Sequence, residues 1–131
     1  MRLLSRWASV GLLAFSGFVG AHGECDSAKT QMEMTHCSAQ AYQAADDELN
    51  EAYQRLVDRL EHNSASLEKL REAQRQWIGF RDAECAFESS AVEGGSAQPM
   101  IRNFCLESLT QTRTQTLLEY ASCEEGDLGC P

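Results

Sequence analysis

The segment that follows Thr30 contains neither proline nor glycine up to Glu61, and its apolar residues recur every three or four positions. This spacing is that of one face of an α-helix. Thr30-Gln31-Met32-Glu33 has the pattern of a capping box, with Thr30 as the N-cap and the Glu33 side chain reaching back to it. The pattern predicts one long helix that ends in a turn at His62-Asn63. Its apolar stripe consists of Met34, Cys37, Ala41, Ala45, Leu49, Tyr53, Leu56 and Leu60.

A second helical stripe begins after this turn, with Ser64 or Ser66 as the expected N-cap, and fades near Ser89-Ser90. Residues 93–99, which contain two glycines and a proline, are expected to form a loop. The second stripe is Leu67, Leu70, Gln74, Trp77, Arg81 and Cys85, and we expect Ala73, Ile78 and Phe80 to widen it. Trp77 and Phe80 are interpreted as core residues rather than as a platform for stacking sugars.

A third helix is predicted from about Met100 to Ala121, and residues 122–131 form an acidic tail with two cysteines. Its stripe is Ile101, Cys105, Leu109, Arg113, Leu117 and Tyr120 or Ala121. No apolar alternation of period two is long enough for a strand. The sequence therefore predicts an all-α fold, a three-helix bundle with one long N-terminal helix.

The N-terminus has the features of a secretory signal peptide over residues 1–21. Arg2 and Arg6 precede an apolar run from Val10 to Val19, and Ala21 offers a cleavage position. The run is shorter than the roughly 20 apolar residues of a membrane-spanning helix, although a retained anchor is the alternative. We therefore expect a periplasmic or secreted protein whose helical domain covers residues 22–121.

The net charge of the chain limits the classes of partner that it is expected to bind. The chain has 131 residues with 11 Lys+Arg against 20 Asp+Glu, and removal of residues 1–21 would take away two of the arginines. Phosphate binding needs an excess of cations, so nucleic acid is not an expected partner. An acidic protein instead attracts basic partners over long distances.

Six cysteines in a short exported chain predict disulfide bonds rather than a metal site. They are Cys25, Cys37, Cys85, Cys105, Cys123 and Cys130. Six cysteines allow 15 pairings, among which spacing alone does not choose. No Cys-x-x-Cys pair supports zinc. Copper binding by His22 with Met32, Met34 and His36 is a weaker alternative, because residues two apart on a helix do not converge.

Two polar residues, Gln74 and Arg81, interrupt the apolar stripe of the second helix. A guanidinium that faces a core needs a carboxylate partner, since unpaired burial of a charge is costly. We expect Arg81 to meet Asp46 or Asn50 on the first helix, close to Tyr53 and Trp77. The favoured interpretation is a device that fixes how the helices align, and the alternative is an acid–base site.

Arg113 on the third helix is a similar case, with Asp82 or Glu84 as its expected partner. No nucleophile triad, phosphate loop or His-Glu-x-x-His motif is present, so an enzyme is the least supported class.

Three groups of residues resemble one known family, the LprI-type lysozyme inhibitors. They are Gln31-x-Glu33-Met34-x-x-Cys37 with Asp46-x-x-Leu49-Asn50-x-x-Tyr53; Gln74-Arg75-x-Trp77-x-x-Phe80-Arg81-Asp82-x-x-Cys85; and Gly94-Gly95-Ser96 with Cys105-x-x-x-Leu109-Thr110-x-x-Arg113-Thr114-x-x-Leu117. The resemblance implies an exported, cysteine-bridged helical domain without a cofactor. It also implies the pairs Cys25–Cys37 and Cys85–Cys105, which leaves Cys123 with Cys130.

The function implied by this resemblance is inhibition of a basic, lysozyme-type wall hydrolase by protein–protein binding. The alternative is an immunity or envelope-stress protein with another target. A loop held by a disulfide loses little entropy on binding. The expected contact residues therefore lie at the loop between the second and third helices: Glu88, Glu93, Gly94, Gly95 and Ser96.

Overall fold

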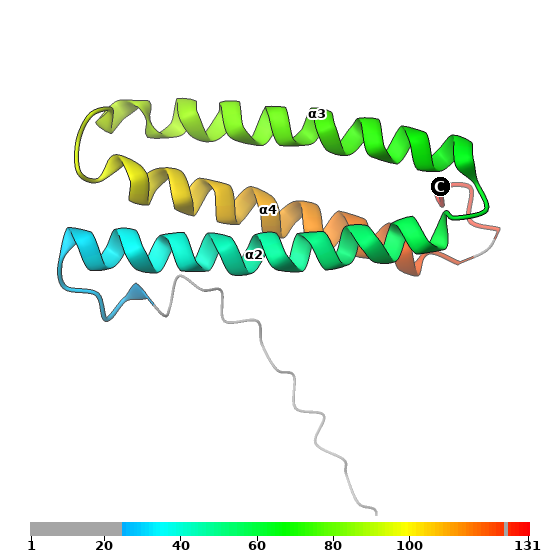
Figure 1. Cartoon of the computed structure of the whole chain (residues 1–131), viewed down its shortest axis with the longest axis horizontal. Helices are drawn as coiled ribbons and strands as arrows, with labels where there is room; N and C mark the ends of the chain where they lie inside the picture. The colour runs from blue at the N-terminus through cyan, green and yellow to red at the C-terminus, as the bar shows by residue number, and fades with distance from the viewer. Residues whose placement is uncertain (1–24, 125) are drawn as a thin grey trace, which may run out of the picture.

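The computed structural model describes residues 25–124 and 126–131, so the predicted signal peptide lies outside the described residues. Three long helices run side by side along one axis (Figure 1): α2 over Gln31–Arg59, α3 over Ser64–Glu88 and α4 over Gln98–Ser122. A short 3-10 turn, η1 at Ser89–Val92, follows α3. No strand occurs among the described residues. The predicted all-α, three-helix fold is therefore confirmed.

Helix α2 begins with the capping box that the sequence predicts. Glu33 N donates to Thr30 Oγ1 at 3.1 Å, and Glu33 Oε2 accepts from Thr30 N at 3.1 Å and Lys29 N at 2.7 Å. These bonds satisfy backbone N–H groups that the first helical turn leaves without partners. The helix ends at Arg59, two residues before the predicted position.

The capping box makes the free energy of unfolding depend on pH. Backbone hydrogen bonds from Lys29 and Thr30 lower the pKa of Glu33 below its ordinary value. The folded protein therefore gains stability from ionised Glu33 at neutral pH and loses it as the pH falls through the lowered pKa. We expect Glu33→Gln to be less stable at pH 7 and to show a flatter decline between about pH 5 and 3. Thermal unfolding of both proteins across this range, followed by circular dichroism, measures the difference.

The ends of the other two helices differ from the predictions by a few residues. Asn63, rather than Ser64 or Ser66, is the N-cap of α3, and its Oδ1 accepts from Ser66 N at 3.1 Å. Helix α4 starts at Gln98, so Pro99 lies in its first turn rather than in the loop. Proline is tolerated there because the first helical N–H groups have no partner within the helix.

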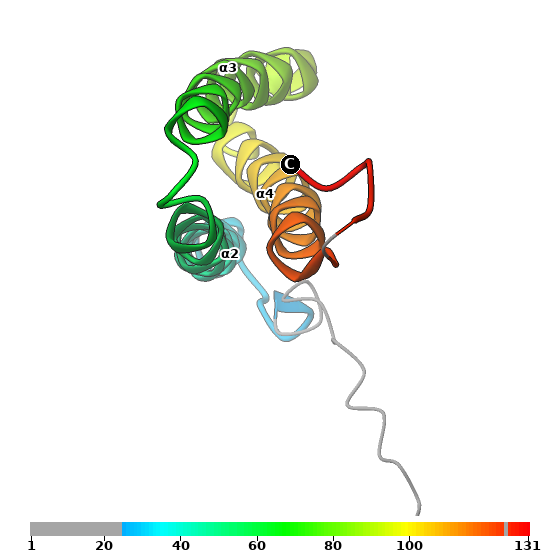
Figure 2. The same ribbon diagram turned by 90° about the vertical axis from the view of Figure 1, so that its right-hand side faces the viewer.

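The core lies mainly between α2 and α4, which pack along each other over most of their length, whereas α3 packs chiefly on α4 (Figure 2). Small residues on the inner face of α2, such as Ala45 and Ala52, let α4 approach closely. The largest apolar cluster is Leu49, Ala52, Leu56, Leu60, Leu70 and Leu117. Because α3 contacts mainly one neighbour, only Leu70, Arg81 and Cys85 of this helix are buried.

The expectation that Ala73, Ile78 and Phe80 would widen the apolar stripe of α3 is wrong. All three residues are exposed, Phe80 with 56% of its surface accessible. A helix that packs on one main partner buries a narrow face, and these residues lie on either side of it. Trp77 is partly buried against the main core cluster, as predicted.

The three disulfides join the pairs that the family resemblance implies: Cys25–Cys37, Cys85–Cys105 and Cys123–Cys130. The first connects the lead-in to α2, and the third closes a small loop in the tail. Arg59, the last residue of α2, donates from Nη1 to the carbonyl of Ala121 in the last turn of α4 and from Nη2 to Cys130 Sγ in the tail, each at 2.9 Å.

Candidate functional site

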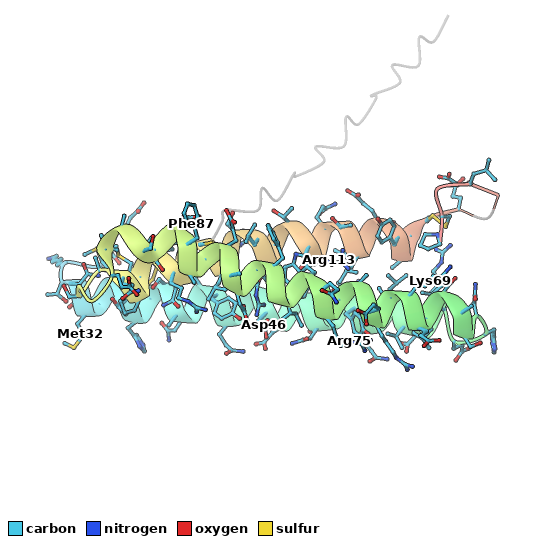
Figure 3. All side chains as sticks on the ribbon, turned by 90° about the horizontal axis from the view of Figure 1, so that it is seen from above. Met32, Asp46, Lys69, Arg75, Phe87 and Arg113 are labelled. Carbon is cyan, nitrogen blue, oxygen red and sulfur yellow. A yellow bond between two sulfur atoms is a disulfide. The ribbon has the colours of Figure 1, made fainter. Side chains whose placement is uncertain are left out.

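Helix α3 presents two chemically different flanks on either side of its buried face. The arginine flank, Arg71, Arg75 and Ile78, lies on the side of α2. The glutamate flank, Phe80, Glu84, Phe87 and Glu88, lies on the side of α4, because residues at spacings of three, four and seven share one helix face. Figure 3 shows this division: Asp46 and Arg75 lie along the α2 edge of α3, and Phe87 projects on the other edge.

The buried face between the flanks carries Arg81, of which 8% is exposed. Its Nη1 lies 3.5 Å from Asp46 Oδ1 on α2, and its Nη2 lies 2.9 Å from Asp82 Oδ1 on its own helix. The guanidinium carbon also lies 5.2 Å from the Trp77 ring centroid and 5.6 Å from that of Tyr42. Charge and ring contacts together replace the water that this cation loses on burial.

The expected contact between Arg81 and Asp46 is therefore present, whereas other residues predicted for this polar cluster lie nearer the surface. Asn50 is exposed and donates from Nδ2 to Asp46 Oδ2 at 3.4 Å. Tyr53 and Gln74 are half-buried. The cluster thus opens to solvent instead of being enclosed in the core.

The prediction that Arg113 pairs with Asp82 or Glu84 is wrong. Arg113 Nε donates to Gln74 Oε1 at 3.1 Å, and its guanidinium carbon lies 5.9 Å from the Trp77 ring. Asp82 is paired with Arg81, and Glu84 lies on the glutamate flank, nearer the loop. Partial burial without a carboxylate partner lowers the pKa of Arg113.

A groove of about 480 Å³ separates α2 from α3 beside the arginine flank. Burial raises the pKa of Tyr42, one of its lining residues, and keeps the phenol neutral as a hydrogen-bond donor. The α2 side contributes Tyr42, Asp46, Leu49, Asn50 and Tyr53, and the α3 side contributes Arg71, Gln74, Arg75, Ile78 and Arg81.

A second groove, of about 250 Å³, lies between the glutamate flank and α4. Glu84 and Glu88 form one wall, and Phe104, Cys105, Ser108 and Leu109 line the rest. Phe87, with 74% of its surface exposed, stands on the same flank. An apolar floor beside two carboxylates suits the stem and charged head of a lysine or arginine side chain.

The loop that was predicted as the contact region continues from this groove. Glu88 lines the groove, whereas Glu93, Gly94, Gly95 and Ser96 are exposed in the loop itself. Gly94 has a φ of 76°, a conformation that favours glycine, and its N–H donates to Gln98 Oε1 at 2.9 Å. The Cys85–Cys105 bridge ties the two helices together just behind the loop.

Glu88 is among the contact residues that the sequence predicts, whereas its neighbours Glu84 and Phe104 are not. The spacing of Glu84 and Glu88, four residues apart with Phe87 beside them, was the available signal. It became informative only once the position of α4 was known.

Within the described part of the chain, no three His, Cys, Asp or Glu side chains come together as a possible metal site. His22, the centre of the copper alternative, lies outside it. None of the helices that the structure describes is both long and apolar enough to cross a membrane.

A family profile and related proteins match most of the chain. The family profile described as "Lysozyme inhibitor LprI" matches residues 23–117. An uncharacterized protein of Rhizobium meliloti (strain 1021) is 36% identical over 113 residues, which cover 78% of this chain and 81% of that protein. The crystal structure of a DUF1311 family protein from Pseudomonas putida KT2440 superposes with a TM-score of 0.65 at 26% identity, covering 72% of this chain and 97% of that one.

Proposed function

Because this chain belongs to the LprI lysozyme inhibitor family, we propose that it is an exported inhibitor of a basic, lysozyme-type wall hydrolase. The proposed contact surface is the glutamate flank of α3 together with the adjoining loop of residues 93–96. The inhibitor acts by binding and blocking the hydrolase, and it contributes no catalytic group.

The observation that supports this surface is the groove beside Glu84 and Glu88. Its floor, which includes Phe104 and Leu109, is apolar and its wall is acidic. Arginine is frequent at the centre of protein–protein interfaces because its stem packs on apolar surface while its head binds carboxylates. A cationic side chain of the partner would make both contacts here.

The exposed Phe80 and Phe87 extend this surface along α3. Exposed aromatic side chains in one patch are typical of interaction surfaces, since they bury a large apolar area on binding. The Cys85–Cys105 bridge and the short η1 turn hold the patch and the loop in one arrangement before the partner arrives. Such preorganisation reduces the entropy lost on association.

Net charge favours the same class of partner. The chain carries −9 at neutral pH, or −11 if residues 1–21 are removed. Opposite net charges steer two proteins together and raise the association rate, an effect that salt weakens.

We expect Glu84→Gln/Glu88→Gln to inhibit a basic lysozyme about tenfold more weakly than the unaltered protein at low salt, because two carboxylates at the groove are lost. The measurement is the clearing of a cell-wall suspension by lysozyme over a range of inhibitor concentrations. The matched control is Glu48→Gln/Glu51→Gln, which removes the same charge from exposed positions of α2. The difference should shrink in about 1 M salt, where the Debye length is about 3 Å.

Two outcomes would contradict this proposal. If the unaltered protein at a tenfold molar excess does not slow any basic lysozyme, the inhibitor function is wrong. In that case a different wall-directed partner, such as a secreted toxin, takes its place as the candidate. If both charge variants weaken inhibition equally, the function stands but the surface is misplaced.

A further inference from the structure

We propose that the groove between α2 and α3 binds a small sugar that carries a carboxylate group. This site lies beside the arginine flank, on the opposite side of α3 from the proposed lysozyme surface. It is independent of lysozyme inhibition, and either function can fail without the other.

The charge of the groove is opposite to that of the protein. Three of the 11 Lys+Arg residues line it, although the chain as a whole has 20 Asp+Glu. Arg81 is already engaged by Asp46 and Asp82. Arg71, in contrast, forms no ion pair among the described residues, and Arg75 contacts only the exposed Glu72. Arg71 is available to an anion, Arg75 keeps further N–H donors beside its exposed pair with Glu72, and the planar shape of both groups suits a carboxylate.

The remaining lining residues suit the uncharged part of a sugar. Tyr42 and Tyr53 offer ring faces and hydroxyl groups, and Asn50 and Gln74 offer amides that both donate and accept. Asp46 can accept a further hydrogen bond from a hydroxyl group of the ligand. A site for a simple inorganic anion would need only the cations, so the tyrosines and amides favour a larger, hydroxyl-bearing ligand.

The size of the groove agrees with a small molecule. Its volume of about 480 Å³ lies within the range of roughly 300–1,000 Å³ typical of small-ligand pockets. It stays open because α3 packs mainly on α4 and leaves its α2 side less covered.

The residues that carry the family resemblance also gather here. Those that line the groove are Asp46, Asn50, Tyr53, Gln74, Arg75 and Arg81. Packing explains the buried Arg81, and Asn50 donates one hydrogen bond to Asp46, whereas the exposed Arg75 contacts Glu72 on its own helix. A ligand in the groove would give the remaining donors of Asn50 and Arg75 a partner.

The test is calorimetric titration of the protein with N-acetylmuramic acid and with N-acetylglucosamine. These sugars differ by the lactyl group that carries the carboxylate. We expect the acid to bind at least about tenfold more tightly than the neutral sugar, and Arg71→Gln/Arg75→Gln to lose about tenfold in affinity for the acid. Both substituted residues are exposed, so the variant should fold, which circular dichroism verifies.

The matched control is Arg55→Gln/Lys69→Gln, which removes two exposed cations outside the groove and should bind as the unaltered protein does. Inorganic phosphate serves as a third probe. The proposal is overturned if the acid does not bind at about 10 mM, if the neutral sugar binds equally well, or if phosphate binds as tightly as the acid. Equal losses in the two charge variants would also overturn it.

Discussion

Replacing Cys85 and Cys105 together by serine is expected to lower the free energy of unfolding by about 2–4 kcal/mol. The bridge closes a chain segment of 20 residues, and its removal lets the unfolded chain explore many more conformations. Cys85 is completely buried and Cys105 nearly so, so the new hydroxyl groups would also enter an apolar cluster with Leu106.

Urea unfolding of the oxidised proteins, followed by circular dichroism, measures this loss. The matched control is Cys123→Ser/Cys130→Ser, which opens a loop of only seven residues in the tail and should cost less. We also expect the Cys85/Cys105 variant to inhibit lysozyme more weakly at temperatures where it is still folded, since the loop is no longer held. A loss of stability no larger than that of the tail variant would contradict the structural role of this bridge.

The second large effect is expected for Arg81→Ala, which should destabilise the protein by about 2–3 kcal/mol. The substitution removes the contact with Asp46 across the α2–α3 interface and two contacts with aromatic rings. Both carboxylate partners are partly exposed, so water recovers some of the lost interaction and the cost stays below that of a fully buried pair.

A double-mutant cycle separates the contribution of the interhelical pair from that of the rings. Asp46→Asn and Arg81→Ala should be less than additive, because the second substitution removes a contact that the first has already weakened. Arg71→Ala, on the exposed arginine flank, should change the stability by less than about 0.5 kcal/mol. If Arg81→Ala keeps full stability but loses binding, Arg81 is a functional rather than an aligning residue.

Local features of the fold could be predicted from the sequence because they depend on neighbours along the chain. The stripe from Met34 to Leu60 and the capping box at Thr30 act within a few residues of each other, and both occur as expected. The Arg81–Asp46 contact could also be predicted, since a buried cation requires an anion and Asp46 lies on the side of α2 that faces α3.

Other features that depend on how the helices pack against one another could not be predicted. The exposure of Phe80 and the partner of Arg113 both follow from the position of α3 over α4. The two grooves could not be predicted for the same reason. Each is lined by residues from two helices, and the spacing of apolar residues along the chain does not give the distance between those helices.

The uneven packing of α3 has a consequence for its motion. Near its C-terminal end, α3 is joined to α4 by the disulfide of Cys85, and at its N-terminal end a short connection leads back to α2. Between these two ends, α3 makes few contacts with α2. Regions with few buried contacts exchange their amide protons through small local openings rather than through complete unfolding. Apart from the fraying helix ends, deuterium uptake should therefore be faster along the middle of α3 than along the middle of α2 or α4. The spacing between α2 and α3 should adjust to an occupant while the bridged end stays fixed.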